Sequence, residues 1–152
     1  MLLIVFFMTS LLTRSSSNLA RKNKIDILKY NILICPVHLT NINHWTVIVV
    51  NFNLKYIHHL DSYPKQIIKD HSYIIKLRTF LDDYITLNYN IQYNWAEWKF
   101  DIPQDIPMQA LKSYDCGIFI CLYVKHLCVY RDILNRLTIS HDINILRNRI
   151  KK

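Results

Sequence analysis

Nucleophilic catalysis by a cysteine needs a thiolate, a base within reach and a group that orients the base. Cys116 begins an almost wholly apolar stretch, and residues 116–130 are predicted to form a buried helix. Asp115 is a natural N-cap for this helix, because its carboxylate can accept free backbone N–H groups. The dipole and the unpaired N–H groups of a helix N-terminus favour the thiolate form of Cys116. A cysteine in an apolar helix can equally be a small core residue, which is our interpretation of Cys121 and Cys128.

A candidate base and a candidate orienting carboxylate flank a predicted hairpin. His44 directly precedes a strand predicted at residues 45–52, and Asp61 directly follows a strand predicted at residues 55–60. Only a few residues separate the two strands, so we expect them to pair, with His44 and Asp61 at the same end. There Asp61 would hold the imidazole in the tautomer that a general base needs. Either residue alone is more often a surface residue; their combination with Cys116 indicates a site.

The same helix also carries residue types that bind zinc. Cys116, Cys121, His126 and Cys128 are spaced by 5, 5 and 2 residues, so their side chains point in different directions along the helix. We therefore expect no metal site, and nothing suggests another cofactor. Gly117 is the only glycine of the chain, which excludes the glycine-rich loops that bind phosphates and dinucleotides. Beside Cys116, a glycine would let the backbone of a substrate approach closely.

The elements that must position these residues follow from the apolar periodicity and indicate an α+β order. Helices are expected at residues 1–14, 66–87, 116–130 and near 140–150, and strands at residues 31–39, 45–52 and 55–60. Residues 91–100 are expected to be extended with a slip in register near Ala96, followed by a proline-containing loop at residues 101–107. A length of 152 residues predicts one domain with one core.

The first twelve residues, Met1–Leu12, form an apolar run that is too short to span a membrane, which takes about twenty residues. The run lacks the basic region and the clear cleavage site of a secretory signal. We expect a buried amphipathic helix, with a secretory signal as the alternative. Four cysteines do not make the dense disulfide framework of a small secreted domain, which favours a reducing compartment.

The charge distribution bears on the class of partner. Nineteen Lys and Arg residues face eleven Asp and Glu residues, which gives a net charge of +8 that is concentrated near the two ends of the chain. Residues 81–115 are acidic. A nucleic-acid-binding protein would show a basic stripe with interleaved aromatic residues, whereas these charges are dispersed. We expect no nucleic-acid partner, while a positive surface would favour an acidic protein.

Taken in order, the motifs resemble a known family. They are Pro36-Val-His-Leu, His44-Trp45 before a hydrophobic strand, Leu60-Asp61-Ser62, Ile106-Pro-Met-Gln109 and Ser113-Tyr-Asp-Cys116-Gly117-Ile-Phe119. This combination resembles the ubiquitin-like-protein-specific proteases, the Ulp1/SENP group of papain-like cysteine proteases. The resemblance implies an α+β, papain-like cysteine proteinase fold, in which a small central mixed or antiparallel sheet is flanked by helices. It covers nearly the whole chain, so residues 1–152 would be a single catalytic domain.

The resemblance also implies a role for each of four residues. Cys116 would attack the carbonyl carbon of the scissile bond. His44 would take the thiol proton and later give one to the leaving amine, and Asp61 would orient His44. Gln109 would donate to the developing oxyanion, an interaction worth about 3 kcal/mol in comparable sites.

The substrate implied by the resemblance is SUMO or another ubiquitin-like protein and its conjugates. Trp45 would form one wall of a narrow tunnel for the diglycine tail, with Gly117 as a second substrate-binding residue; core packing is the alternative for Trp45. The enzyme would be a cysteine-type isopeptidase or C-terminal hydrolase that cleaves after Gly-Gly. The sequence does not distinguish SUMO, NEDD8 and ubiquitin as the substrate. A nuclear or cytoplasmic monomer that does not bind membranes would be expected.

Three departures from the family pattern qualify these expectations. Residues 4–14 resemble the first helix of the family, and the Trp-Leu-Asn-Asp type of segment that precedes that helix is missing. The stretch between Gln109 and Cys116 is one residue longer than usual, and the family's catalytic domain is longer than 152 residues. We therefore expect an N-terminally truncated catalytic domain. The alternative is a catalytically impaired remnant of the fold that binds ubiquitin-like proteins without cleaving them.

Overall fold

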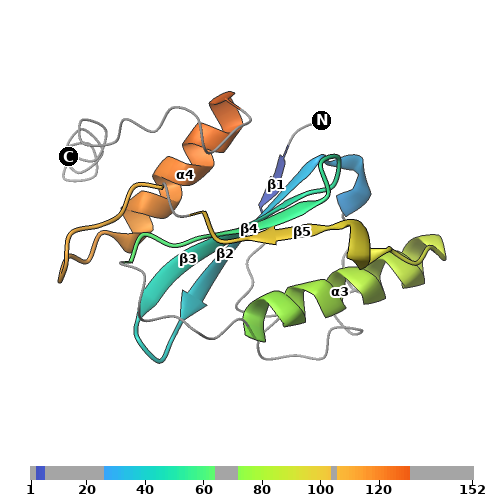
Figure 1. Cartoon of the computed structure of the whole chain (residues 1–152), viewed down its shortest axis with the longest axis horizontal. Coiled ribbons are helices and arrows are strands. Elements are labelled where there is room, and N and C mark those ends of the chain that lie inside the picture. The colour runs from blue at the N-terminus through green and yellow to red at the C-terminus, as the bar shows by residue number, and fades with distance from the viewer. Residues whose placement is uncertain (1–2, 6–25, 64–71, 104–105, 131–152) are drawn as a thin grey trace.

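The computed structural model describes residues 3–5, 26–63, 72–103 and 106–130, which form a mixed sheet with a long helix on each face (Figure 1). In chain order the elements are β1 (Leu3–Val5), the 3-10 turn η1 (Ile27–Lys29), β2 (Ile32–Leu39), β3 (His44–Asn51), β4 (Tyr56–Leu60), α3 (Ser72–Tyr89), the 3-10 turn η2 (Trp95–Glu97), β5 (Lys99–Asp101) and α4 (Cys116–Tyr130). The five strands lie in the order β1-β2-β3-β4-β5. This arrangement confirms the predicted α+β class with a small mixed sheet between helices.

The three central strands are antiparallel, and the outer strands β1 and β5 run parallel to their neighbours. Valine and isoleucine dominate β3, and such β-branched side chains suit a strand that is buried on both faces. β3 and β4 pair as the predicted hairpin. Its turn is closed by Asn51, whose Oδ1 accepts hydrogen bonds from the backbone N–H groups of Asn53 and Leu54 at 3.1 and 2.9 Å.

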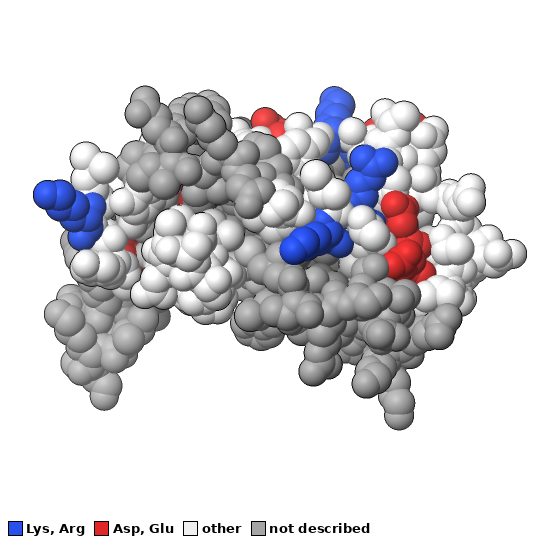
Figure 2. Space-filling view, turned by 90° about the horizontal axis from the view of Figure 1, so that it is seen from below, with Lys and Arg blue, Asp and Glu red and all other residues white. Residues whose placement is uncertain are grey.

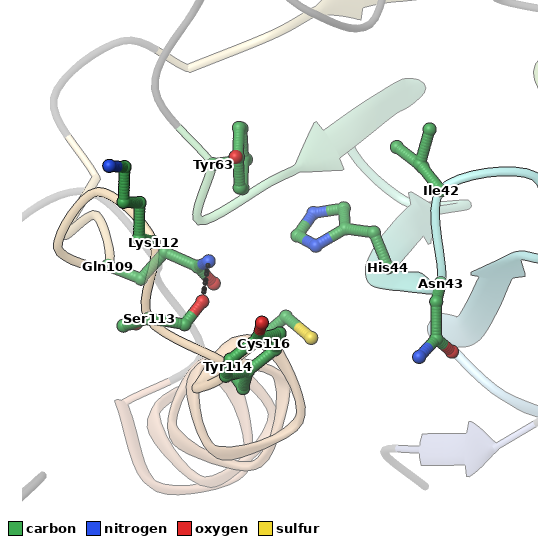
Figure 3. A pocket seen from close by; sticks show the side chains of 9 residues that line it. All are labelled: Ile42, Asn43, His44, Tyr63, Gln109, Lys112, Ser113, Tyr114 and Cys116. Atoms are coloured by element: carbon green, nitrogen blue, oxygen red, sulfur yellow. Dashed lines mark hydrogen bonds between the residues drawn. The ribbon is translucent and has the colours of Figure 1, made fainter.

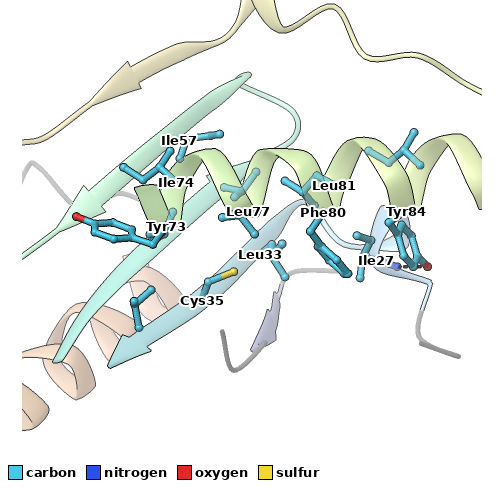
Figure 4. Packing of buried hydrophobic residues seen from close by; sticks show 14 residues of the cluster. Ile27, Leu33, Cys35, Ile57, Tyr73, Ile74, Leu77, Phe80, Leu81 and Tyr84 are labelled. Carbon is cyan, nitrogen blue, oxygen red and sulfur yellow. Dashed lines mark hydrogen bonds between the residues drawn. The ribbon is translucent and has the colours of Figure 1, made fainter. Parts of the chain in front are cut away.

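Successive side chains of the central strands point to opposite faces of the sheet and so form two apolar cores. The core under α3 contains the strand residues Leu33, Cys35, Val37, Ile48, Val50 and Ile57 and the helix residues Tyr73, Ile74, Leu77, Phe80, Leu81, Tyr84 and Ile85 (Figure 4). The core under α4 contains Ile32, Ile34, Val47, Val49, Leu60, Ile106, Phe119, Ile120, Tyr123 and Leu127. Because both faces are covered, the sheet is a fixed frame for the residues at its edges and ends.

The two long helices match the predicted ones within the described residues. α4 begins at Cys116, as predicted, and the backbone O of Asp115 accepts from the N–H groups of Ile118 and Phe119. α3 covers residues 72–87 of the helix expected at 66–87 and continues to Tyr89, while residues 66–71 and the helix expected near 140–150 lie outside the described residues. No helix in the described part of the chain is long and apolar enough to cross a lipid bilayer.

The prediction of a helix at residues 1–14 is wrong for residues 3–5, which form the strand β1. The other residues of that stretch lie outside the described part of the chain. Leu3, Ile4 and Val5 lie opposite Ile32–Ile34 of β2. A short apolar run does not distinguish a strand from a helix by its periodicity. The edge of β2 decides the outcome, because its backbone groups need hydrogen-bond partners.

The extended segment expected at residues 91–100 is only partly confirmed. Its last residues belong to β5, which pairs with β4. Where a slip in register was expected near Ala96, the chain instead forms the 3-10 turn η2. In this turn the Asn94 side chain accepts a hydrogen bond from the Ala96 N–H at 3.2 Å. An asparagine that caps a turn in this way offers the backbone an alternative to strand pairing.

Charged side chains do not form a continuous basic stripe on the described part of the face shown in Figure 2. Lys and Arg side chains are separated by uncharged surface, and Asp and Glu side chains lie beside some of them. One close pair on the surface joins Lys55 to Glu97, and both side chains are about half exposed. Exposed pairs of this kind contribute little to stability.

Candidate active site

A pocket of about 530 Å³ lies where the N-terminus of α4 meets the start of β3 and the segment after β4. Its lining residues are Ile42, Asn43, His44, Tyr63, Gln109, Lys112, Ser113, Tyr114 and Cys116 (Figure 3). Three of the four residues that the resemblance assigns to catalysis therefore line one cavity. The fourth, Asp61, lies behind His44 and contacts it directly.

The imidazole of His44 is held by Asp61. The Nε2 of His44 lies 2.6 Å from Oδ1 of Asp61, and both side chains are largely buried. The same Oδ1 accepts the backbone N–H of Tyr63 at 2.8 Å, which fixes the carboxylate on the turn after β4. An ionised carboxylate only accepts hydrogen bonds, so Nε2 must carry the proton and Nδ1 of the neutral ring is left as the acceptor. His44 and Asp61 thus lie at the same end of the β3–β4 hairpin, as predicted.

Cys116 approaches the pocket from the helix on the other side. It is the first residue of α4 and is partly exposed, and Figure 3 shows its side chain and the His44 ring facing the same cavity. Among the hydrogen bonds of the described residues, none joins Sγ of Cys116 to His44. Hydrogen bonds between catalytic groups often tighten only when substrate is bound. The N-terminus of a helix carries the positive end of its dipole, so the place of Cys116 at the start of α4 favours negative charge on its sulfur.

The side chain of Gln109 is fixed at both ends of its amide. Its Oε1 accepts from the hydroxyl of Ser62, and its Nε2 donates to the backbone O of Ser113, each at 2.9 Å. The backbone N–H of Gln109 also donates to the Ser62 O at 2.8 Å. Between Gln109 and Cys116 the chain makes a turn, in which Lys112 adopts a left-handed φ of 64° and the Ser113 N–H donates to the backbone O of Ala110. With this turn, Gln109 and Cys116 line the same pocket.

The segment that carries Gln109 is also attached to α4. The hydroxyl of Tyr123 donates to the backbone O of Pro107, two residues before Gln109. Burial, reinforced by the negative charge of Asp61, raises the pKa of Tyr123 well above its usual value. Tyr123 thus remains a neutral donor at physiological pH and keeps the segment against the helix.

Trp45 and Gly117 do not line the pocket of His44. Together they line a neighbouring one of about 490 Å³, with Pro36, Ile120, Cys121, Val124 and Lys125. The Trp45 ring packs at the edge of the α4 core and stacks on His38, with ring centroids 4.6 Å apart. Apart from its two chain neighbours and the backbone of its own helix, a Cβ added at Gly117 would meet no atom within 4 Å. Cys116 and Gly117, adjacent in sequence, thus belong to two adjoining cavities.

The remaining cysteines do not assemble a second centre in the described part of the chain. All four thiols are free, and no group of three His, Cys, Asp or Glu side chains there is arranged to hold a metal ion. Cys121 and Cys128 are exposed, so the expectation that they are core residues is wrong for both. Burial raises the pKa of the Cys35 thiol far above its usual range.

The sequence interpretation did not foresee the parts played by Ser62, Ser113 and Tyr63. Ser62 entered only as the last residue of the Leu60-Asp61-Ser62 motif. Its contact with Gln109 joins residues 47 positions apart, so no local pattern reports it. The one usable signal was that Ser62 directly follows Asp61.

Comparison with known proteins gives a consistent assignment. Residues 8–152 match the model of the Ulp1 protease family, C-terminal catalytic domain. Sentrin-specific protease 2 of Pongo abelii is 30% identical over 105 residues, which are 68% of this chain and 17% of that protein. A sentrin-specific protease of Caenorhabditis elegans is 28% identical over 119 residues, which are 78% of this chain and 16% of that protein. The chain thus spans about a sixth of the length of these curated relatives.

Solved structures agree on the fold. The SUMO protease Ulp1 with its catalytic cysteine oxidised to a sulfonic acid matches with a TM-score of 0.70 at 21% identity, over 97% of this chain and 65% of that one. The Ulp1 protease domain in complex with Smt3, the yeast ortholog of SUMO, matches with a TM-score of 0.69 at 22% identity, over 97% and 64% of the two chains. These matches confirm the papain-like α+β fold. By fold and by sequence, this chain belongs to the Ulp1 protease family.

Proposed function

We propose that this chain is a cysteine peptidase that releases a ubiquitin-like protein, most directly SUMO, from its conjugates or its precursor. The observation that carries the proposal is the His44–Asp61 hydrogen bond at 2.6 Å beside a pocket that Cys116 and Gln109 also line. A cysteine nucleophile, an oriented base and an amide donor are the groups that thiol-dependent acyl transfer requires. Family membership supports the substrate class.

The proposed reaction begins with transfer of the Cys116 thiol proton to Nδ1 of His44, the ring nitrogen that Asp61 leaves unprotonated. The thiolate attacks the carbonyl carbon of the last glycine of the ubiquitin-like protein, and the negative charge moves to the carbonyl oxygen. One hydrogen of the Gln109 amide is bound by Ser113, which leaves the second for this oxyanion. His44 gives its proton to the leaving amine as the C–N bond breaks, and a thioester to Cys116 remains.

Water then completes the cycle. His44 accepts a proton from the water, whose oxygen attacks the thioester carbonyl carbon. The C–S bond breaks, the proton returns to the Cys116 sulfur, and the free carboxyl group of the ubiquitin-like protein leaves. Asp61 stabilises the imidazolium form that His44 adopts in both half-reactions, without itself taking the proton. We also assign Trp45 and Gly117 to the approach of the glycine tail, because they line the cavity next to Cys116.

The proposal extends to the domain organisation of the protein and to its location in the cell. Residues 1–152 would act as one catalytic domain, as a monomer in the nucleus or cytoplasm. Four free cysteines fit a reducing compartment, where disulfides do not persist.

The experiment is hydrolysis of a fluorogenic amide at the C-terminus of SUMO, with ubiquitin and NEDD8 amides measured in parallel. Cys116→Ala and His44→Ala should each lower kcat/KM by about 10⁴-fold or more. The exposed Cys128→Ala, on the same helix but outside both cavities, is the matched control and should keep full activity. Absence of labelling by a SUMO vinyl sulfone in well-folded protein would overturn the proposal. SUMO binding without turnover, unchanged in Cys116→Ala, would instead indicate the non-catalytic remnant.

A further inference from the structure

We propose that Ser62 is a positioning residue that sets the orientation of the Gln109 side-chain amide toward the pocket. This inference rests on the proposed function, because it concerns the oxyanion donor of that reaction. Ser62 is only 2% exposed and Gln109 only 5%, so neither side chain has free access to water as an alternative partner. Ser62 itself does not line the pocket, so it would act through Gln109.

The hydrogen bonds leave the amide one orientation. The backbone O of Ser113 can only accept, so the group 2.9 Å from it must be the nitrogen of Gln109. Oε1 therefore faces Ser62, and the hydroxyl at 2.9 Å must donate to it. A rotation of the amide by half a turn would set two carbonyl oxygens against each other. Together the two serines thus fix both ends of the amide.

The orientation matters because the amide nitrogen carries two hydrogens. Ser113 takes one of them, and the second is the hydrogen available to an oxyanion. Without the Ser62 hydroxyl, the buried Oε1 would lack its donor, and a buried acceptor without a donor is costly. The amide would then turn toward any other donor it can reach, and its second hydrogen would no longer be held in place before the substrate arrives. Preorganisation of this kind is what makes an oxyanion donor effective.

Ser62 directly follows Asp61 in the chain, so the contacts of His44 and of Gln109 come from neighbouring residues. The adjacent residue, Asp61, holds His44, while Ser62 holds Gln109 through its hydroxyl and through its backbone O. The dipeptide Asp61-Ser62, directly after β4, thus orients both the general base His44 and the oxyanion donor Gln109. The side chains of these two neighbours have separable tasks, and that separation can be tested.

The test is a double-mutant cycle of Ser62→Ala and Gln109→Ala, measured with the SUMO C-terminal amide. We expect Ser62→Ala to lower kcat by about 10- to 100-fold with little change in KM, and the double variant to be no slower than Gln109→Ala alone. The control is Thr46→Val, since the buried Thr46 hydroxyl has no hydrogen-bond partner among the described residues. It removes a buried hydroxyl close to His44 and should stay within twofold of the original kcat.

A second measurement separates positioning from general damage to the site. The rate at which iodoacetamide alkylates Cys116, followed against pH, should be the same in Ser62→Ala and in the original protein, because the His44–Asp61 pair is untouched. If Ser62→Ala does not fold, Ser62→Cys serves instead: it keeps the size but offers a weak donor, and kcat should fall to an intermediate value. Full activity of Ser62→Ala, or losses that multiply in the double variant, would overturn the inference.

Failure of the proposed function is recognised separately, as a lack of turnover in the unmodified protein. In that case the side-chain amide of Gln109 is observed directly by NMR. One of its two hydrogens should exchange slowly in the original protein and in Thr46→Val, and quickly in Ser62→Ala. Equal exchange in all three proteins would overturn the role of Ser62 whether or not the protein is a peptidase.

Discussion

The two faces of the sheet are built differently. Under α3, aliphatic and aromatic side chains close the core along the length of the helix (Figure 4). Under α4, the apolar core gives way at the N-terminal end of the helix to buried polar residues, among them His44, Ser62 and Gln109. The hydrogen-bond partners of these three residues lie within the same region. The α3 face should therefore govern stability, and the end of the α4 face should govern chemistry.

The largest expected effect is on the chemical side. Asp61→Asn should lower kcat by about 10² to 10⁴-fold, because an amide nitrogen can face His44 and favour the wrong tautomer. The matched control is Asp101→Asn, an exposed carboxyl group on β5, which should leave kcat unchanged. The two variants are compared by steady-state hydrolysis of the SUMO amide. Equal kcat values for both would remove Asp61 from the site.

The corresponding substitution on the other face should act on stability alone. Leu77 is 0% exposed in the α3 core, and Leu77→Ala should lower the free energy of unfolding by about 2–5 kcal/mol. Its exposed neighbour Lys76 provides the control, Lys76→Ala, with a change of at most about 0.5 kcal/mol. Urea unfolding gives the stabilities, and kcat is measured where the variant is folded. A large fall in kcat for folded Leu77→Ala would contradict the division between the faces.

A smaller effect is expected beside the nucleophile. Gly117→Val should keep its stability, because a Cβ at this position meets no atom within 4 Å beyond its chain neighbours and its own helix backbone. Turnover of the SUMO amide should nevertheless fall by about tenfold or more, since the added side chain would occupy space that the glycine tail needs. Alkylation of Cys116 by iodoacetamide, a small reagent, is the internal control and should be unchanged. Normal turnover would mean that the glycine has no part in substrate binding.

The smallest expected effect is a pH dependence of stability on the α4 side. The pKa of Tyr123 is raised in the folded protein by burial and by the charge of Asp61, whereas an unfolded tyrosine titrates near pH 10. A raised folded pKa means that its contribution to stability is complete below about pH 10 and is lost as the pH rises further. Thermal unfolding should show a decline in Tm above about pH 10, and Tyr123→Phe should flatten it. An equally steep decline in that variant would assign the effect to other groups.

The sequence alone predicts much of this division. The valine- and isoleucine-rich run of β3 and the apolar run from Cys116 define their elements locally, so both were predicted correctly, and the hairpin argument then brings His44 to Asp61. Residues 3–5 were mispredicted because their state depends on the free edge of β2, a distant partner. The Ser62–Gln109 contact could not be predicted from the sequence for the same reason, because it depends on how two segments distant in the chain pack together.

The spacing of the site's contacts along the chain also bears on how the site assembles. His44 and Asp61 are 17 residues apart in one hairpin, whereas Ser62 and Gln109 are 47 residues apart. Closing a longer loop costs more chain entropy, and contacts between distant residues form more slowly. We therefore expect the base and its carboxylate to come together first, and the thiol of Cys116 to meet them only when α4 docks on the finished sheet. A reactive thiolate would then arise only in a chain that has already folded.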